Sequence, residues 1–202
     1  MPKIIDHDER RQELIEASWA VIAAEGLEGV TMRKIATAAG CTTGRITHYF
    51  ADREALILAA LSAVNAATSA RIDALLQQDK PVFERLLAAA HEALPLDAAR
   101  LLEWKVWIAF WGAATVTPAL AKENESRQQE WLTAITPLIA LLSPHADAGY
   151  EAERVMGLLN GLGLRVAIHP STKNQTDATT TIARHLQGLA RRDKARGNKD
   201  KQ

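Results

Sequence analysis

The twenty residues 31–50 constrain the fold of this chain more than any other segment. They have the pattern of two short helices separated at Gly40, a residue that adopts the positive φ of a helix-ending turn at little cost. Ala36 is small enough to let the two helices cross closely, and Ile46 is spaced to face back into the crossing. This joint pattern predicts a helix-turn-helix, whose second helix offers its outer face to a DNA major groove.

Polar residues around this turn are the candidate DNA contacts. Thr31 is a good N-cap for the first helix and Thr42 for the second. Arg45 is long enough to reach guanine edges or phosphates, the threonines suit thymine methyls or phosphates, and Gly44 lets the backbone approach DNA closely. The predicted contacts are Thr31, Arg33, Thr42, Thr43, Gly44, Arg45, Thr47, His48, Tyr49 and Arg53. The alternative is an ordinary helical hairpin with a solvated polar face.

The charge balance makes any DNA site a local patch. Lys and Arg total 24, as do Asp and Glu, so the formal net charge is zero. This excludes a protein that binds nucleic acid through a strongly basic surface. Within residues 31–53, however, Arg33, Lys34, Arg45 and Arg53 face only Asp52. The attraction to phosphates is modest in one subunit, and two subunits binding together would strengthen it.

Composition also bounds the compartment. The single cysteine, Cys41, excludes an intramolecular disulfide. The beginning of the chain lacks the apolar stretch of a signal peptide, and no run reads as long enough to span a membrane. We therefore expect a soluble cytoplasmic protein.

The rest of the chain predicts an all-α fold, because alternating β-branched runs are missing and Ala, Leu, Glu and Gln dominate. The predicted helices outside the helix-turn-helix cover residues 8–25, 53–78, 81–94, 97–115, 118–142 with a kink at Pro137, 148–169 and 177–191. Asp52 caps the helix over 53–78, whose expected inner face is Leu56, Ala60, Ala63, Ala67 and Ala74. Residues 171–176 are an expected polar loop.

Three segments follow from this pattern. Residues 1–50 are the predicted DNA-binding domain, and residues 51–192 a larger helical domain for effector binding and dimerisation. The polar, basic residues 193–202 are expected to be disordered.

One predicted helix carries a concentration of aromatic side chains. Trp104, Trp107, Phe110 and Trp111 fall within eight residues of a chain that has only five tryptophans. Trp104, Trp107 and Trp111 share a face by their spacing. These residues are candidates for an aromatic box that holds a quaternary ammonium ion by cation–π attraction. The alternative is simple core packing or a dimer contact.

The helix-turn-helix and the residues after it resemble a known family. The order Thr-x-x-x-Ile-Ala-x-x-Ala-Gly, Gly-x-Ile-x-x-Tyr-Phe and Asp52-Arg53-Glu54-x-Leu56 is similar to the N-terminal domain of the TetR/AcrR bacterial transcription regulators. The resemblance implies a homodimeric repressor that binds a palindromic operator and is released when a small molecule binds the C-terminal domain. It places a positive charge, usually lysine and here Arg53, near a phosphate.

A narrower resemblance extends into the second half. Residues 104–111, Asn160-Gly-Leu-Gly-Leu-Arg165 and Ala183-Arg-His-Leu186 are similar to segments of the choline-sensing (BetI-type) repressors of glycine-betaine synthesis. Choline or another quaternary amine is the effector that this implies. Gly163 departs from the pattern, because those repressors tend to carry an aromatic residue there. A regulator of an unrelated efflux or catabolic substrate is therefore the alternative.

The resemblance also implies that the last two helices form a four-helix bundle with their partners in a dimer. A symmetric operator needs two half-sites, read about one helical turn apart. The predicted interface residues are Val155, Leu158, Leu159, Leu162, Val166, Ile182, Leu186 and Leu189. The alternative is an intramolecular core contact.

Other classes of function fit less well. The six histidines are scattered without metal-ligand spacing, and no phosphate-binding loop, nucleophile elbow or Cys/His cluster occurs. We expect no enzyme activity, metal or cofactor. An interaction adaptor would leave Arg33, Arg45 and Arg53 unexplained.

Overall fold

The computed structural model of the chain is all-α, as predicted, with nine helices and no strand in the part that it describes. It describes the backbone of residues 7–199 and the side chains of residues 7–191. The helices are α1 (His7–Glu25), α2 (Met32–Ala38), α3 (Thr43–Tyr49), α4 (Arg53–Leu76), α5 (Val82–Glu92), α6 (Ala98–Ala114), α7 (Pro118–Leu142), α8 (Ala148–Ile168) and α9 (Thr172–Lys199).

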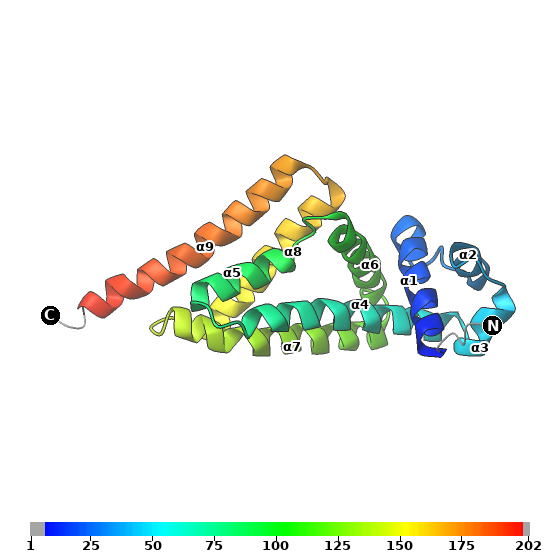
Figure 1. Cartoon of the computed structure of the whole chain (residues 1–202). Helices are drawn as coiled ribbons and strands as arrows, with labels where there is room; N and C mark the ends of the chain where they lie inside the picture. The colour runs from blue at the N-terminus through cyan, green and yellow to red at the C-terminus, as the bar shows by residue number, and fades with distance from the viewer. Residues whose placement is uncertain (1–6, 200–202) are drawn as a thin grey trace. The chain divides into compact units, whose positions relative to one another are not determined.

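The chain forms two compact units. Unit 1 contains the described residues up to Ala67 and the segment Leu102–Ala121. Helix α2 packs against both α1 and α3, as Figure 1 shows at the blue end of the chain. The core of unit 1 is apolar and includes Leu14, Ile15, Ile22, Ile35, Ile46, Leu56, Leu61, Val106 and Phe110. This core positions the helix-turn-helix.

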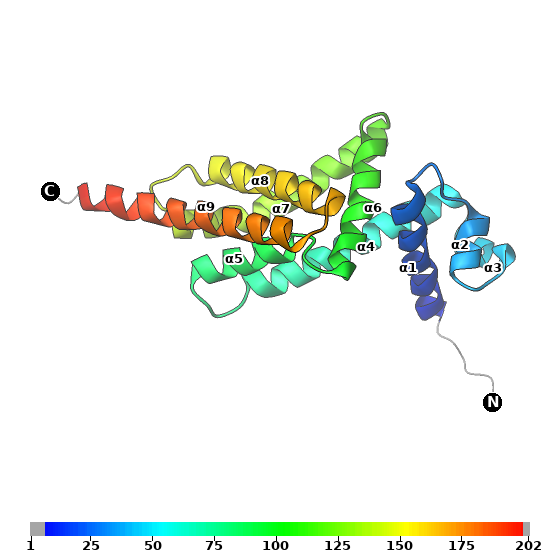
Figure 2. The same cartoon turned by 90° about the horizontal axis from the view of Figure 1, so that it is seen from above.

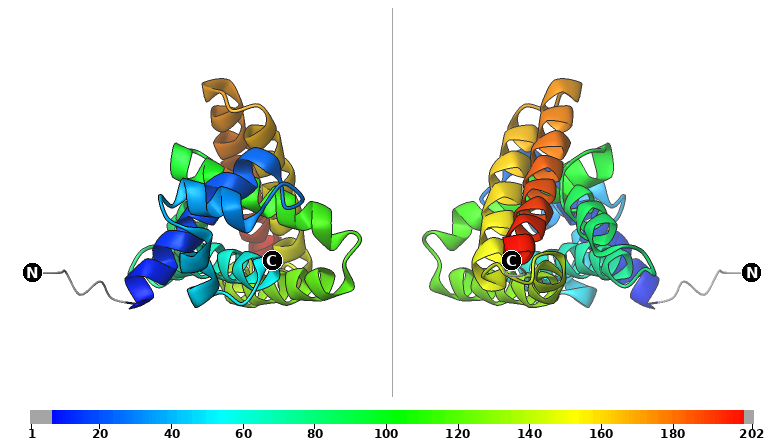
Figure 3. Two further views of the ribbon diagram at one scale, coloured as in Figure 1. Left: turned by 90° about the vertical axis from the view of Figure 1, so that its right-hand side faces the viewer. Right: turned by 90° about the vertical axis from the view of Figure 1, so that its left-hand side faces the viewer.

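Unit 2 contains Thr68–Leu101 and the chain from Lys122 onward. Helix α9 packs on α8 and on α5, and Figures 2 and 3 show α8 and α9 running side by side. Its core includes Ile72, Leu86, Leu94, Ile135, Ile139, Val155, Val166, Ile182 and Leu186. Unit 2 therefore buries its own apolar surface within one chain.

Helix α4 contributes to both units. Leu56 and Ala60 are fully buried as predicted. The expected inner position of Ala74 was wrong, because it is exposed. The larger side chains of Ile72 and Leu76 take the buried positions in this part of α4 and bury more apolar area than an alanine.

The expectation that no run could span a membrane also needs correction. Among the described residues, α4 is long and apolar enough to do so by length and composition alone, with a mean hydropathy of 1.5 over eighteen residues. Its apolar side chains instead serve the two cores, where Leu56, Leu61, Val64 and Ile72 are buried. A core helix passes the same test as a membrane span.

Helix α9 is longer than predicted at both ends. The polar residues 171–176 were an expected loop, but the helix begins at Thr172. Ser171 accepts a hydrogen bond from the Asn174 backbone N–H at 3.2 Å, so this polar stretch begins the helix with a side-chain cap. The backbone stays helical to Lys199, into the predicted disordered tail. Residues 200–202 lie outside the described residues.

The division into units differs from the predicted division of the chain. The predicted boundary followed residue 50, whereas unit 1 also includes α4 up to Ala67 and most of α6. Leu56 and Leu61 of α4, with Val106 and Phe110 of α6, belong to the same buried core as the helix-turn-helix. The limits of the functional domains stay predictions.

Candidate DNA-binding surface and effector region

The turn between α2 and α3 has the predicted geometry. Gly40 has a φ of 61°, and the Cys41 N–H donates to the Ala36 carbonyl at 2.9 Å. Ala36 is 4% exposed and Ile46 fully buried, so both lie inside the crossing of the helices. These local predictions are confirmed.

The two threonine caps behave differently. The Thr31 hydroxyl accepts a hydrogen bond from the Lys34 backbone N–H at 3.2 Å, which caps α2 as predicted. Thr42 occupies the N-cap position of α3, but its side chain makes no capping hydrogen bond. The orphan N–H groups at the start of α3 are therefore not satisfied by this side chain.

The outward face of α3 is polar and exposed. Ile46 turns its side chain into the core, while Arg45 and Thr47 on either side of it are exposed. The exposed members of the predicted DNA-contacting set are Thr31, Arg33, Thr42, Thr43, Gly44, Arg45, Thr47 and His48. Tyr49 and Arg53 are half-buried. Their contacts with DNA stay predictions.

Gly44 occupies open space. A Cβ atom built on it meets nothing within 4 Å, so no neighbouring atom of the described chain excludes a side chain there. A glycine inside a helix costs about 0.5–1 kcal/mol relative to alanine. A glycine kept at Gly44 despite this cost fits a position where DNA approaches the backbone closely.

Arg53 joins two elements of unit 1. Its Nε donates to the Val30 carbonyl at 2.8 Å, and Nη2 donates to the Leu27 carbonyl. Both carbonyls lie in the connection between α1 and α2. The guanidinium therefore fastens this connection to the start of α4, a role that the sequence did not indicate.

Lys34 is likewise engaged within the protein. Its ammonium pairs with the Glu25 carboxylate and donates to the Gly29 carbonyl at 2.9 Å. Four cations lie between residues 31 and 53, and Arg33 and Arg45 are the two exposed ones whose side chains are not engaged in this way within the described protein. They are the best-placed cations for phosphates or base edges.

Two residues of α1 that were absent from the predicted site contact the end of α3. The His7 ring lies 4.5 Å from the Tyr49 ring between centroids, and the Arg11 guanidinium carbon lies 5.1 Å from the centroid of Phe50. Some forty residues separate these partners in the chain, and no periodic pattern signals such a contact. Only the packing of α1 reveals it.

The aromatic residues of α6 divide into two groups. The ring centroids of Trp104 and Trp111 lie 5.6 Å apart at an interplanar angle of 87°, and those of Trp107 and Trp111 lie 6.4 Å apart. The three indoles therefore share one face, as their spacing predicts. Trp104 is 8% exposed, whereas Trp107 and Trp111 are half-buried.

Phe110 does not fit the predicted box. It is fully buried in the core of unit 1 together with Val106. Its edge meets Trp107 at 5.9 Å between ring centroids. Phe110 therefore lies on the core side of α6 and contacts Trp107 from there. Glu103, next to Trp104, is a buried carboxylate on the same helix.

The predicted dimer residues lie mainly in the core of a single chain. Seven of them are buried in unit 2: Val155, Leu159, Leu162, Val166, Ile182, Leu186 and Leu189. Leu158 is partly buried against the same core. The packing of α8 on α9, and of α9 on α5, uses this surface within the chain, as the alternative interpretation had it.

A different face of α8 is exposed. Tyr150, Leu164 and Ile168 are 62%, 38% and 58% exposed, so α8 carries more large exposed apolar side chains than any other described helix. Gly157 and Gly161 are exposed on the same face, since the intervals from 157 to 161, 164 and 168 follow the helical repeat. We call these five residues the α8 stripe.

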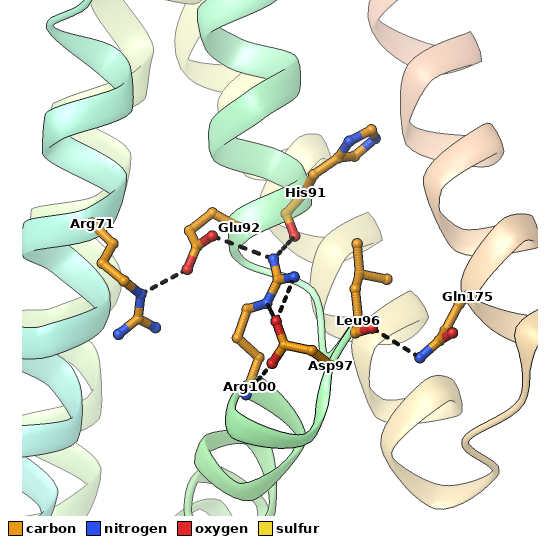
Figure 4. A network of polar contacts seen from close by, with 7 residues as sticks. All are labelled: Arg71, His91, Glu92, Leu96, Asp97, Arg100 and Gln175. Atoms are coloured by element: carbon orange, nitrogen blue, oxygen red, sulfur yellow. Dashed lines mark hydrogen bonds and ion pairs between the residues drawn. The ribbon is translucent and has the colours of Figure 1, made fainter.

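A charged network stabilises the corner between α5 and α6 (Figure 4). Glu92, at the end of α5, accepts from Arg71 Nε at 2.7 Å and pairs with Arg100 Nη1 at 3.3 Å. Arg100 also binds the Asp97 carboxylate at 2.8 Å and the His91 carbonyl at 3.0 Å. A carboxylate at a helix C-terminus is unfavourable by itself, and the two arginines offset this.

The same corner is attached to α9. Gln175 donates to the Leu96 carbonyl at 3.2 Å.

Two titratable groups at this corner have lowered pKa values. Burial lowers the pKa of the His91 imidazole and the nearby positive charge of Arg100 lowers it further, against the opposing effect of a hydrogen bond with the Thr179 backbone. His91 is therefore favoured as the neutral ring. The backbone N–H and then the guanidinium of Arg100 hold the pKa of Asp97 below its usual range.

Metal-binding groups do not gather in the described part of the chain. No cluster of three or more His, Cys, Asp or Glu side chains is placed there to hold a metal ion. Cys41 is a half-buried free thiol in the turn.

The crossing of α2 and α3 and the polar outer face of α3 define a helix-turn-helix protein. Residues 14–60 match the family model of bacterial regulatory proteins of the tetR family, and residues 83–191 match the model of the BetI-type transcriptional repressor C-terminal domain. The chain belongs to the TetR family and has a BetI-type C-terminal domain. It is a DNA-binding transcriptional regulator and not an enzyme.

Relatives along the whole chain agree. The HTH-type transcriptional regulator PksA of Bacillus subtilis is 31% identical over 200 residues, covering 96% of each chain. The regulator BetI of Serratia proteamaculans is 29% identical over 182 residues, covering 88% of this chain and 91% of its own. A solved transcriptional regulator from Saccharomonospora viridis in complex with choline shares the fold, with 23% identity, a TM-score of 0.82 and coverage of 90% and 97%.

Proposed function

We propose that α3 reads one half of an inverted-repeat operator and that the protein is a repressor released by a small molecule. The observation that carries the first part is the two-sided character of α3. Ile46 is fully buried in the crossing with α2, whereas Arg45, Thr47 and His48 are exposed. A short helix that buries one face in the core and has a polar outer face suits insertion into a major groove.

The Arg45→Ala variant tests this placement. Arg45 lies on the exposed face and supports no core contact, so we expect the variant to unfold at the wild-type temperature. Loss of a bidentate base contact should weaken operator binding by about 5- to 150-fold. The probe is the DNA duplex that wild-type protein enriches from a random pool, and Lys173→Ala removes an exposed cation of unit 2 as the matched control. Unchanged affinity in Arg45→Ala would contradict the placement.

We also propose that the protein acts as a homodimer through the α8 stripe. The residues first expected at the interface are occupied by the core, so a partner needs another apolar surface. The stripe offers Leu164 and Ile168 beside the exposed Gly157 and Gly161. Glycines allow two helices to approach closely, and a two-fold axis lets the same stripe meet its copy.

Leu164→Glu tests the dimer. A carboxylate placed between two apolar stripes is costly to desolvate, so we expect the variant to sediment as a monomer with unchanged helix content. The control is Leu141→Glu. Leu141 is a leucine of α7 that is 65% exposed, and its substitution should leave the oligomeric state unchanged. A Leu164→Glu protein that stays dimeric would exclude this face.

Choline or a related quaternary amine is our proposed effector. Support comes from the face of Trp104, Trp107 and Trp111 on α6 and from the choline bound to the Saccharomonospora viridis protein. A quaternary ammonium against an indole face gains about 0.5–2 kcal/mol. Gly163, buried in α8, stands where related repressors tend to have an aromatic residue. A regulator of an efflux or catabolic substrate is the second candidate, favoured by this departure.

A fluorescence titration separates the two candidates. We expect choline to quench tryptophan emission and to weaken operator binding, while its neutral isostere 3,3-dimethylbutan-1-ol, which lacks the charge, does neither. A Trp107→Leu variant should lose the response to choline with its operator affinity kept. No response of DNA-competent wild-type protein to choline would favour the second candidate.

Because a transcription regulator acts where the bacterial DNA is, we propose a cytoplasmic location.

A further inference from the structure

Three aromatic rings meet where the first turn of α1 reaches the last turn of α3. The His7 and Tyr49 ring centroids are 4.5 Å apart. His48 meets Tyr49 edge-on at 5.3 Å, and His7 meets His48 at 5.9 Å. Every ring of this cluster, which we call the His7 cluster, therefore lies within the distance at which aromatic pairs attract.

The same face of α1 also covers Phe50, the residue that follows Tyr49. Arg11 lies four residues after His7, so the two side chains share one face of the helix. The Arg11 guanidinium carbon lies 5.1 Å from the centroid of Phe50. Two successive residues at the end of α3 are thus covered by two successive turns of α1.

Helix α3 depends on such contacts. It has seven residues, and an isolated helix of that length is not stable in water. Ile46 and Phe50 are buried and attach α3 to the core. Tyr49 is half-buried and packs against the core of unit 1 on one side, whereas His48 is exposed. Their rings contact one another and the ring of His7.

We propose that His7 is a positioning residue for DNA recognition, which fixes the rings of Tyr49 and His48 in the last turn of the reading helix. The proposal rests on the proposed function of α3. His7 is itself exposed, so it adds little apolar burial to the core of unit 1. Its action is through ring contact, and an uncharged aromatic residue should replace it.

Substitutions at position 7 separate ring contact from charge. We expect His7→Ala to weaken binding to the duplex enriched by wild-type protein about 2- to 10-fold, the range for loss of an aromatic pair. His7→Phe should restore binding to within a factor of about two at pH 8. Both variants should unfold at the wild-type temperature, and His169→Ala, an exposed histidine of unit 2, should behave as wild type.

Each outcome decides the proposal. The slope of log Kd against log salt should be the same for wild type and His7→Phe, because a lost phosphate contact would change it by about one. Equal affinity of His7→Ala and wild type, or equal weakness of His7→Ala and His7→Phe, would overturn it. A fall in unfolding temperature parallel to the loss of affinity would show a structural role instead. If Arg45→Ala also keeps full affinity, the reading helix itself is misplaced and both proposals fail.

Discussion

Arg53 donates its Nε hydrogen to the Val30 carbonyl at 2.8 Å, and this bond links the start of α4 to the residue before the cap of α2. Leu27 in the same connection accepts from Nη2 of the same guanidinium. A charged donor that satisfies two loop carbonyls holds the α1–α2 connection in one conformation. A basic residue at the start of α4 therefore shapes unit 1, whether or not it also meets a phosphate.

Replacing Arg53 by alanine should destabilise the protein by about 1.5–3 kcal/mol, because a hydrogen bond to a charged group is lost and two carbonyls lose their partner. Arg53→Lys should lose less, since one ammonium replaces one of the two donors. Urea unfolding monitored by circular dichroism measures both. The control is Arg33→Ala, at an exposed position, and an Arg53→Ala protein as stable as this control would contradict the structural role.

Gly44→Ala should separate stability from recognition. A Cβ atom at this position meets nothing within 4 Å, so alanine should raise the free energy of unfolding by about 0.5–1 kcal/mol. If the Gly44 backbone approaches DNA closely, the same methyl group should weaken operator binding. Thermal unfolding and operator titration test the two effects. A variant with unchanged affinity would show that DNA does not contact the Gly44 backbone closely.

Glu92→Ala should destabilise unit 2. The Glu92 carboxylate is 20% exposed and pairs with both Arg71 and Arg100. Its removal leaves two arginines without this counter-charge, which we expect to cost about 1–2 kcal/mol, between the values for exposed and buried pairs. Glu13→Ala removes an exposed pair with Arg10 and should change the free energy of unfolding by less than about 0.5 kcal/mol. Equal effects of the two substitutions would contradict a special role for the α5–α6 corner.

Stability should fall in mildly acidic solution, in part because of His91. Burial lowers the pKa of His91 in the folded protein below its ordinary value of 6.5. The unfolded chain therefore binds a proton first, so the contribution of His91 is complete above pH 6.5 and is lost as the pH falls toward the folded pKa. Urea unfolding at pH 7.5 and 5.5 should show a smaller loss for His91→Asn than for wild type. An equal loss would assign the pH dependence to other groups.

The helix-turn-helix was predictable because its determinants are local. Gly40 supplies the positive φ, Thr31 the cap, and Ala36 and Ile46 the crossing, all within sixteen residues. Periodicity likewise located every helix, since apolar residues recur with the helical repeat wherever a face is buried. Helix ends were less predictable, and α9 begins earlier than its polar first turn suggested.

The sequence could not predict which surface buries the apolar residues of α8 and α9. Val155 and Leu186 have the spacing of an apolar stripe, which is the same for a stripe that meets α5 and one that meets a second subunit. The structure buries both within one chain and leaves Leu164 and Ile168 exposed. Only the positions of the neighbouring helices distinguish the two cases.

The sequence by itself determined the all-α fold, the helix-turn-helix and the face of α3 that carries Arg45, because these depend on residues a few positions apart. The tertiary structure decided the tasks of Arg53, Phe110 and His7. Arg53 binds loop carbonyls, Phe110 belongs to the core, and His7 meets Tyr49. Each of these depends on a partner brought near by the packing of other helices, and local sequence patterns carry no record of such distant partners.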